Sequence, residues 1–386
     1  MRERRAEEAA AALVRREAWS AGRPVGEVGE FALIERLERW VTAATATAAA
    51  GPSAAGAAPV ARVTLAMGDD AALLDPPADS EIVLTCDVQA EGRHFHPAWL
   101  TPHELGRRAI EINLSDLAAM GARPAAALIS LGLPRDLGLD TVEQLYAGML
   151  AALGGHGARI AGGNVSGADK LWIDITLIGT VERGRALRRS GARVGDLVMV
   201  TGAPGRAAAA EALLTAVEAP RDAAPGEPHE PSLAACLAEL RAAYAAPEAR
   251  VAAGRHLLER DAATAAIDVS DGLAADLGHL AAASGVALRL EEALLPVDAA
   301  LAGSAAALER DPLDWILGAS DDYELAFTVP RARASRALAM RQTLELPVTL
   351  IGHVVAGEPG VHLHRRTGKT IALSGGWDHL RPGPPA

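Results

Sequence analysis

The chain alternates between two hydrophobic spacings, one typical of strands and one typical of helices. Compact apolar or alternating runs predict strands at 63–67, 82–86, 125–131, 171–181, 196–201 and 265–269. Apolar residues three or four positions apart predict helices over 30–40, 105–120, 142–153, 206–217 and 273–283. The stretch 42–61, rich in Ala, Pro and Gly, is expected to be a flexible connector. Strands that alternate with helices in this way predict an α/β fold.

The length and the linkers predict two domains. The chain has 386 residues and 50% hydrophobic content, enough for two ordinary cores. Residues 1–28 mix Arg with Glu and lack the apolar core of a secretory signal, so we expect a frayed or helical N-terminal extension. We expect one domain over 29–182 and a second over 183–386. A proline-rich stretch at about 218–232 predicts a surface insertion in the second domain.

Charge and residue usage exclude several classes of protein. The net charge of −12 argues against nucleic-acid binding, which needs a basic surface, and no apolar run has membrane length. The two lysines, Lys170 and Lys369, lie in neither a P-loop nor a protein-kinase motif. The two cysteines, Cys86 and Cys236, cannot build a disulfide framework, so we expect a reducing, cytoplasmic location.

Acidic residues recur where apolar segments meet turns, at Asp70, Asp87, Asp116 and the pair Asp268 and Asp271. Magnesium is usually held by one or two carboxylates together with substrate phosphates, so scattered single Asp residues suit it better than a closed cage. Asp is also common in turns and at helix caps. For any one of these residues the structural explanation stays open, but the recurrence favours a metal site.

Two glycine-containing segments are candidates for phosphate contact. Gly162-Gly163-Asn164 is expected in a loop at a strand exit, where backbone amides could approach a phosphate, although an ordinary turn explains the glycines equally well. Asp268 and Asp271 flank a turn at the start of the predicted helix 273–283, where backbone N–H groups favour phosphate.

Several motifs recur in a fixed order along the chain. They are Glu30-Phe31-Ala32-Leu33-Ile34, Gly68-Asp69-Asp70, Glu91-Gly92-Arg93-His94-Phe95, Asn113-Leu114-Ser115-Asp116, Arg189-Ser190-Gly191, Asp268-Val269-Ser270-Asp271-Gly272 and Asp322-Tyr323-Glu324-Leu325. Together they resemble the thiamine-monophosphate kinase family, within the aminoimidazole-ribonucleotide-synthetase-like superfamily, over roughly 29–380. The resemblance implies a two-domain fold of mixed sheets flanked by helices. It also implies a homodimer whose N-terminal sheets pair, and ATP-dependent transfer of phosphate to thiamine monophosphate.

The resemblance assigns roles to individual residues. Metal contacts would come from Asp70, Asp87, Asp116, Asn164, Asp268 and Asp271, with Thr85 and Cys86 at flanking positions. The nucleotide would contact Gly163, Asn164, Arg189 and Ser270. Thiamine monophosphate would contact His94, Asp321 and Trp377. Asp116, Asp268 and Arg189 would carry the chemistry, with several Mg²⁺ ions as cofactor.

The chain departs from the family pattern at a few positions. Asn164 replaces an acid, Ser320 replaces a glycine, and Cys86 replaces a residue that usually carries a hydroxyl. These departures motivate an alternative, a catalytically weak regulator that binds nucleotide or thiamine diphosphate on the same scaffold. Another synthetase of the superfamily is a second alternative.

Overall fold

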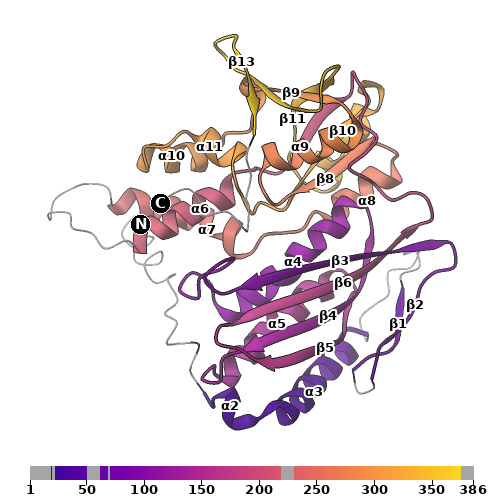
Figure 1. Ribbon diagram of the computed structural model, residues 1–386, viewed down its shortest axis with the longest axis vertical. Helices are drawn as coiled ribbons and strands as arrows, with labels where there is room; N and C mark the ends of the chain where they lie inside the picture. The colour runs from indigo at the N-terminus through magenta and orange to yellow at the C-terminus, as the bar shows by residue number, and fades with distance from the viewer. Residues whose placement is uncertain (1–18, 20–21, 50–60, 68–69, 219–229, 375–386) are drawn as a thin grey trace. The chain divides into compact units, whose positions relative to one another are not determined.

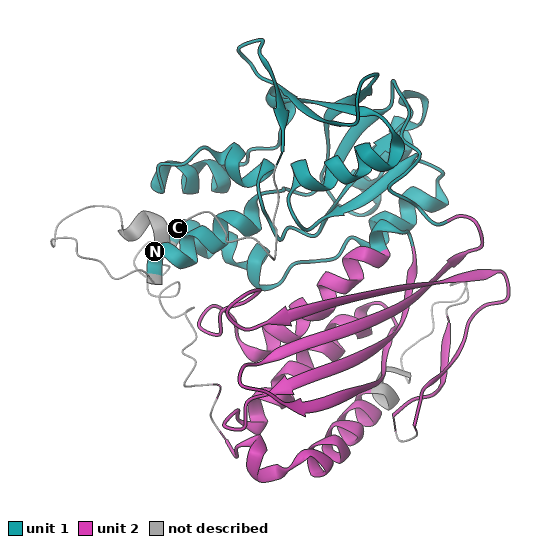
Figure 2. Ribbon diagram, in the orientation of Figure 1, with its two compact units in different colours: residues 1–11, 118–121, 186–386 teal, residues 12–117, 122–185 magenta. Residues whose placement is uncertain are grey.

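The computed structural model describes residues 19, 22–49, 61–67, 70–218 and 230–374 (Figure 1). Their contacts divide the chain into two compact units, drawn in different colours in Figure 2. Unit 2 contains the described residues of 12–117 and 122–185, and unit 1 contains those of 118–121 and 186–386. Each unit is built around its own sheet. No helix in the described part of the chain is long and apolar enough to cross a membrane.

Unit 2 contains a four-stranded sheet in the order β3 (Ser80–Ala90), β6 (Trp172–Glu182), β4 (Arg123–Leu133) and β5 (Arg159–Gly167). The β4–β5 pair is parallel, and the β3–β6 and β6–β4 pairs are antiparallel. Helices α4 (Pro102–Ala119) and α5 (Leu139–Gly155) lie behind this sheet in Figure 1. Alternate residues of β6 are fully buried, namely Ile173, Ile175 and Leu177.

The remaining elements of unit 2 are short, except for one helix. They are α2 (Val25–Val28), α3 (Glu30–Ala49) and the two-stranded sheet of β1 (Arg62–Leu65) and β2 (Leu73–Asp75). The α3 helix packs on α5 and β5, where it buries Leu33 and Leu37.

Helix α4 begins at a reciprocal cap. Thr101 and Glu104 exchange bonds between side chain and backbone, with Glu104 N donating to Thr101 Oγ1 at 3.2 Å and Thr101 N donating to Glu104 Oε2 at 2.8 Å. This arrangement satisfies N–H groups that a helix start leaves without partners. Pro102 occupies the first helical position, where its missing N–H has no cost. The start of the helix that carries Asp116 is therefore well defined.

Unit 1 contains a seven-stranded sheet in the order β13-β12-β9-β11-β7-β10-β8. The strands are β7 (Leu197–Thr201), β8 (Ala265–Val269), β9 (Ala287–Glu291), β10 (Glu324–Val329), β11 (Val348–Val355), β12 (Gly360–His364) and β13 (Thr370–Leu373). The longer helices are α6 (Arg206–Glu218), α7 (Glu230–Ala245), α8 (Val251–Glu259), α9 (Leu273–Ser284), α10 (Ala299–Ala307) and α11 (Pro312–Leu317). All residues of β7, β8 and β10 are buried, so these three neighbouring strands form the centre of the core of unit 1.

Most predicted elements are confirmed, but three expectations were wrong in part. The α3 helix continues to Ala49, so residues 42–49 are not a connector, because alanine is the strongest helix former. The segment 160–167 is not a loop but part of β5, paired in register with β4. Strand β3 runs on to Ala90, so Asp87 lies inside the strand and not at its end. Of the expected insertion, residues 219–229 lie outside the described part, and α7 begins at Glu230.

Candidate active site

A cluster of oxygen ligands in unit 2 lies where β3 meets α4. Side chains alternate between the two faces of a strand, so Thr85 and Asp87 share one face of β3. This is the face toward α4, because Thr85 Oγ1 donates a hydrogen bond to the carboxylate of Asp116 on that helix. All three side chains are half-buried. The fold thus brings Asp116 of α4 to the face of β3 that carries Thr85 and Asp87.

Asn113 adds a buried amide to the same helix. Its Nδ2 donates to the Ala109 carbonyl at 3.0 Å, and its side chain is 1% exposed. Within the described residues, its Oδ1 has no hydrogen-bond partner. Asn113 lies three residues before Asp116, so the two side chains are neighbours on the helix surface. A buried amide oxygen without a donor is a ready acceptor for a cation or a donor group.

Cys86 lies on the opposite face of β3. Its thiol donates to Asp174 of β6 at 3.1 Å, and this hydrogen bond is the largest cause of a raised thiol pKa. The side chain of Cys86 therefore cannot share a metal ion with Thr85 and Asp87. Cys86 was expected at a flanking position of the metal cluster, and its side chain lies on the face of β3 opposite Thr85 and Asp87.

Gly163 and Asn164 lie at the other edge of the sheet. They pair with Ile129 and Ser130 of β4, and two strands, β4 and β6, separate β5 from β3. At ~4.8 Å between neighbouring strands, Asn164 is about 14 Å from β3, so one ion cannot contact both Asn164 and Thr85. A Cβ at Gly163 would overlap the Ile129 carbonyl oxygen, so the close approach of β4 accounts for this glycine. The structure thus gives Gly163 a packing role and separates Asn164 from the β3 cluster.

His94 lies in a tight loop directly after β3. Its Nδ1 accepts a hydrogen bond from the Ala90 N–H at 3.0 Å, and its own N–H donates to the Ala90 carbonyl at 2.9 Å. In the neutral imidazole the proton is therefore on Nε2, which makes Nε2 a donor. Asp70, also in unit 2, is exposed and lies just before β2.

The second group of site residues lies in unit 1, at the carboxyl end of β8. Asp268 is 4% exposed and pairs with Leu325 of the antiparallel strand β10. Ser270 and Asp271 form the turn from β8 into α9. Gly272 closes this turn at a φ of 118°, and a Cβ there would overlap the Gly318 carbonyl. These contacts hold Asp268, Ser270 and Asp271 in one compact turn.

Asp276 is a functional candidate that the sequence patterns did not reveal. Its Oδ2 accepts three backbone hydrogen bonds, from the N–H groups of Ser270, Asp271 and Gly272, at 3.0 to 3.1 Å. Burial, followed by the charge of Asp271, raises the pKa of Asp276 to about 7. The backbone donors that were expected to receive a phosphate at this turn therefore already bind a carboxylate of the same chain. The sequence signal for this contact was the acid in the first turn of α9, because negative charge is favourable at the start of a helix.

Asp321 and Asp322, next to each other in the chain, serve different purposes. Asp321 is half-buried and accepts a hydrogen bond from the Tyr323 hydroxyl at 3.1 Å. Asp322 accepts from the N–H groups of Gly205 and Ala207, and so caps helix α6. Burial raises the pKa of Asp322 to about 6. Of the two acids, Asp321 is the one whose side chain is not engaged in capping a helix.

Glu324 anchors the strand that follows these acids. Arg250 binds its carboxylate through two hydrogen bonds of 2.7 Å each, and Thr201 Oγ1 donates a third at 2.6 Å. The Glu324 side chain is 7% exposed and the Arg250 side chain 21% exposed. This ion pair fixes the start of β10, three residues after Asp321.

The chain segment that contains Arg188 and Arg189 lies beside β8. The neighbouring Arg188 carbonyl accepts from the Ala266 N–H at 2.9 Å, and the Arg189 carbonyl accepts from Ser284 Oγ at 3.0 Å. The Arg189 side chain is exposed, and Ala266 is two residues before Asp268 on β8. Trp377, expected to contact the substrate, lies outside the described residues.

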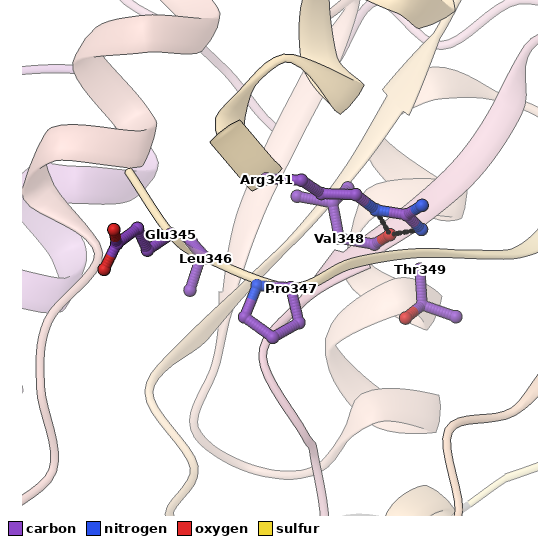
Figure 3. Close-up of a pocket in the computed structure, with 6 residues that line it drawn as sticks. All are labelled: Arg341, Glu345, Leu346, Pro347, Val348 and Thr349. Atoms are coloured by element: carbon purple, nitrogen blue, oxygen red, sulfur yellow. Dashed lines mark hydrogen bonds between the residues drawn. The ribbon is translucent and has the colours of Figure 1, made fainter. Parts of the chain in front are cut away.

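The described residues contain no group of three or more His, Cys, Asp or Glu side chains that could hold a metal ion by themselves. A pocket of about 330 Å³ in unit 1 is lined by residues 341 and 345–349, where Arg341 donates to the Val348 carbonyl (Figure 3). None of the site residues expected from the sequence lines this pocket.

Comparisons with known proteins place the chain in a family. Residues 68–181 match the N-terminal domain of AIR synthase related proteins, and residues 193–364 match the C-terminal domain of the same family. The thiamine-monophosphate kinase of Escherichia coli O157:H7 is 36% identical over 319 residues, covering 82% of this chain and 92% of that protein. The chain belongs to the thiamine-monophosphate kinase family.

Solved structures show the same likeness. The thiamine-monophosphate kinase of Stenotrophomonas maltophilia K279a superposes with a TM-score of 0.69 at 38% identity, covering 78% of this chain and 90% of that chain. The structure of AaThiL complexed with AMPPCP and TMP superposes with a TM-score of 0.65 at 32% identity, covering 92% and 98%. The resemblance read from the ordered motifs and the fold of mixed sheets flanked by helices are both confirmed.

Proposed function

We propose that the protein transfers the γ-phosphoryl group of ATP to thiamine monophosphate and so forms thiamine diphosphate. Its family membership supports this reaction, as does the relative solved with the ATP analogue AMPPCP and TMP. Within this chain, the observation that carries the proposal is the Thr85–Asp116 hydrogen bond with Asp87 on the same face. It gathers the oxygen ligands at the positions of the family motifs.

The reaction requires positioning more than acid–base chemistry. The acceptor is already a phosphate, largely ionised near neutral pH, so no strong general base has to create the nucleophile. The protein has to bring two anions together in line. Arg189 is an exposed and permanently charged group that suits this task, and His94 offers an Nε2–H donor for the substrate phosphate.

We propose that Asp70, Thr85, Asp87 and Asp116 of unit 2 bind magnesium, and that Asp268 and Asp271 of unit 1 form a separate set of magnesium ligands. The residues fit this ion, because all are hard oxygen donors and one or two carboxylates with substrate phosphates are its usual ligands. The buried Asn113 Oδ1, which lacks a hydrogen-bond partner among the described residues, fits as well. Bound magnesium would offset the repulsion between the two phosphate groups.

A product assay with the purified chain tests the function. We expect ATP and Mg²⁺ to convert thiamine monophosphate to thiamine diphosphate, with no comparable phosphorylation of free thiamine, which lacks the acceptor phosphate. Chromatography of both reactions, with a binding measurement for the same ligands, separates the kinase from a weak regulator. Tight binding with negligible product would favour the regulator, and product from thiamine but not from the monophosphate would refute the assignment.

We also propose a homodimer, formed through the face of the unit 2 sheet opposite α4 and α5. On that face β3 exposes Ile82, Leu84 and Val88 at 52%, 65% and 45%, and none of the described helices covers them. β3 is also an edge strand of eleven residues, and such edges readily pair with another chain. A second copy offers the same apolar strand, as two-fold symmetry requires.

The oligomeric state tests this interface. Leu84→Glu places a charge in the middle of the apolar face and should convert the dimer to a monomer in light scattering coupled to gel filtration. Val194→Glu, a similar change at a residue of unit 1 that is 60% exposed, should leave the dimer intact. A monomeric wild type, or a dimeric Leu84→Glu variant, would exclude this interface.

We further propose a cytoplasmic location. The free thiols of Cys86 and Cys236 support it, because reduced cysteines are typical of that compartment.

A further inference from the structure

A segment ahead of the family motifs docks on unit 2. The Trp19 carbonyl accepts two hydrogen bonds from the start of α5, from the Gly138 N–H at 2.9 Å and from Thr141 Oγ1 at 2.7 Å. The Arg23 carbonyl accepts from the Leu139 N–H at 2.9 Å. Two backbone N–H groups and one side-chain hydroxyl around the first turn of α5 are thus engaged, which fixes the position of Trp19.

The Trp19 side chain is buried against an aromatic partner. Its ring stacks on that of Phe95, with 6.3 Å between ring centroids and 18° between the planes. Trp19 is 2% exposed and Phe95 3% exposed, although 76 positions separate them in the chain. Stacked aromatic pairs contribute about 0.5–1.5 kcal/mol beyond the burial of their area. The Trp19 ring therefore covers the ring of Phe95.

Phe95 is the last residue of the tight loop that presents His94. The Gly92 N–H donates to the Phe95 carbonyl at 2.8 Å, and both the N–H and Nδ1 of His94 bond to the backbone of Ala90. The loop is also tied to the residue just before β6, because the Glu91 N–H donates to the Leu171 carbonyl at 2.9 Å. These bonds join the backbone of Phe95 and the imidazole of His94 to the same short loop.

We propose that Trp19 is a positioning residue for the substrate loop, and that its ring holds Phe95 so that His94 Nε2 stays in place for the phosphate of thiamine monophosphate. This inference rests on the proposed function, because the role of His94 belongs to it. Residues 1–28 are then not merely an extension, since one of them supports the site. The effect requires the ring stack and not the indole N–H, which has no hydrogen-bond partner among the described residues.

Steady-state kinetics of the full chain tests the proposal. Trp19→Ala should lower kcat/KM for thiamine monophosphate by about ten- to a hundredfold, because small displacements of a positioned group carry penalties of that order. Most of the change should come from KM, and the KM for ATP should stay within about twofold. Trp19→Phe keeps a ring on Phe95 and should restore at least half of the wild-type value.

Leu37→Ala is the matched control. It removes a side chain that is 1% exposed in the same unit, on α3, without touching the Ala90–Phe95 loop. It should lower the melting temperature at least as much as Trp19→Ala while leaving the KM for thiamine monophosphate unchanged. Equal KM changes in both variants would mean that Trp19 only stabilises the fold, and this result would overturn the proposal. A Trp19→Phe variant as poor as Trp19→Ala would overturn it too, because the N–H would then be required.

Hydrogen exchange gives a readout that does not depend on catalysis. In Trp19→Ala the amides of Gly92 and His94, bonded to Phe95 and Ala90, should exchange at least tenfold faster, and the amides of α4 should not change. Unchanged exchange at Gly92 and His94 would refute the link between Trp19 and the loop, whatever the kinetics. If the wild type forms no thiamine diphosphate but the exchange result holds, the proposed function fails and the positioning of the loop stands.

Discussion

Asp116→Asn should lower kcat about a thousandfold while the chain remains folded, because it removes one negative charge from the oxygen cluster at β3. The change should leave the fold intact, since Asp116 is half-buried and an asparagine oxygen can still accept the hydrogen bond from Thr85 Oγ1. The measurement is the rate of thiamine diphosphate formation at saturating ATP, thiamine monophosphate and Mg²⁺, with a thermal melt of the same sample.

Asp169→Asn provides the control for charge alone. Asp169 is an exposed acid in the same unit, between β5 and β6, so its replacement should change the rate by less than about twofold. If Asp116→Asn keeps more than about a tenth of the wild-type rate with an unchanged melting temperature, Asp116 is not a ligand that the reaction requires.

The sequence predicted the elements well wherever short apolar runs end at turn residues. The strand at 265–269 coincides with β8, and the helices at 206–217 and 273–283 differ from α6 and α9 by one residue each. Their boundaries were readable because Gly202, Gly205 and Gly272 break the pattern beside them.

The sequence could not predict which residues of β3 face the site. Ile82, Leu84 and Val88 are apolar but exposed, while Val83 on the other face is half-buried. Because apolar residues occupy both faces, alternation alone does not identify the side toward α4. The family resemblance grouped Cys86 with Thr85, although the two side chains lie on opposite faces of β3.

The two phosphate-binding expectations stay predictions, and the structure gives the groups at both places a further role. Glycine near Asn164 suggested a loop, but β5 needs Gly163 to pass close to the Ile129 carbonyl. The turn after β8 does present three N–H groups, yet Asp276 from the next helix turn accepts all three. A sequence pattern shows that donors are present, but only the fold shows where their acceptors come from.

The motif Asp322-Tyr323-Glu324-Leu325 is in large part a folding element. Asp322 caps α6, and Glu324 holds Arg250 and Thr201. The side chain of Asp321, just before the motif, accepts a hydrogen bond from the Tyr323 hydroxyl. The motif therefore identifies the family through residues that build the site more than through residues that contact the substrate.

Arg250→Met should lower the free energy of unfolding of unit 1 by about 3–5 kcal/mol, because it leaves the buried carboxylate of Glu324 without its charged partner. Bidentate hydrogen bonds between arginine and a carboxylate are stronger than hydrogen bonds between neutral groups, and both hydrogen bonds here are 2.7 Å long. Urea unfolding followed by hydrogen exchange at the amides of β10 measures the loss for this unit separately, since a chain of two units need not unfold in a single step.

Arg289→Met is the matched control, because it makes the same change in the same unit at an ion pair with Glu291 whose arginine is 45% exposed. Exposed pairs contribute about 0–1 kcal/mol, so the control should lose no more than that. Arg250→Lys keeps the positive charge but loses the planar guanidinium group, so its free energy of unfolding should lie between those of Arg250→Met and the wild type. If Arg250→Met loses no more than Arg289→Met, the carboxylate of Glu324 is sufficiently held by Thr201, and the ion pair does not fix the start of β10.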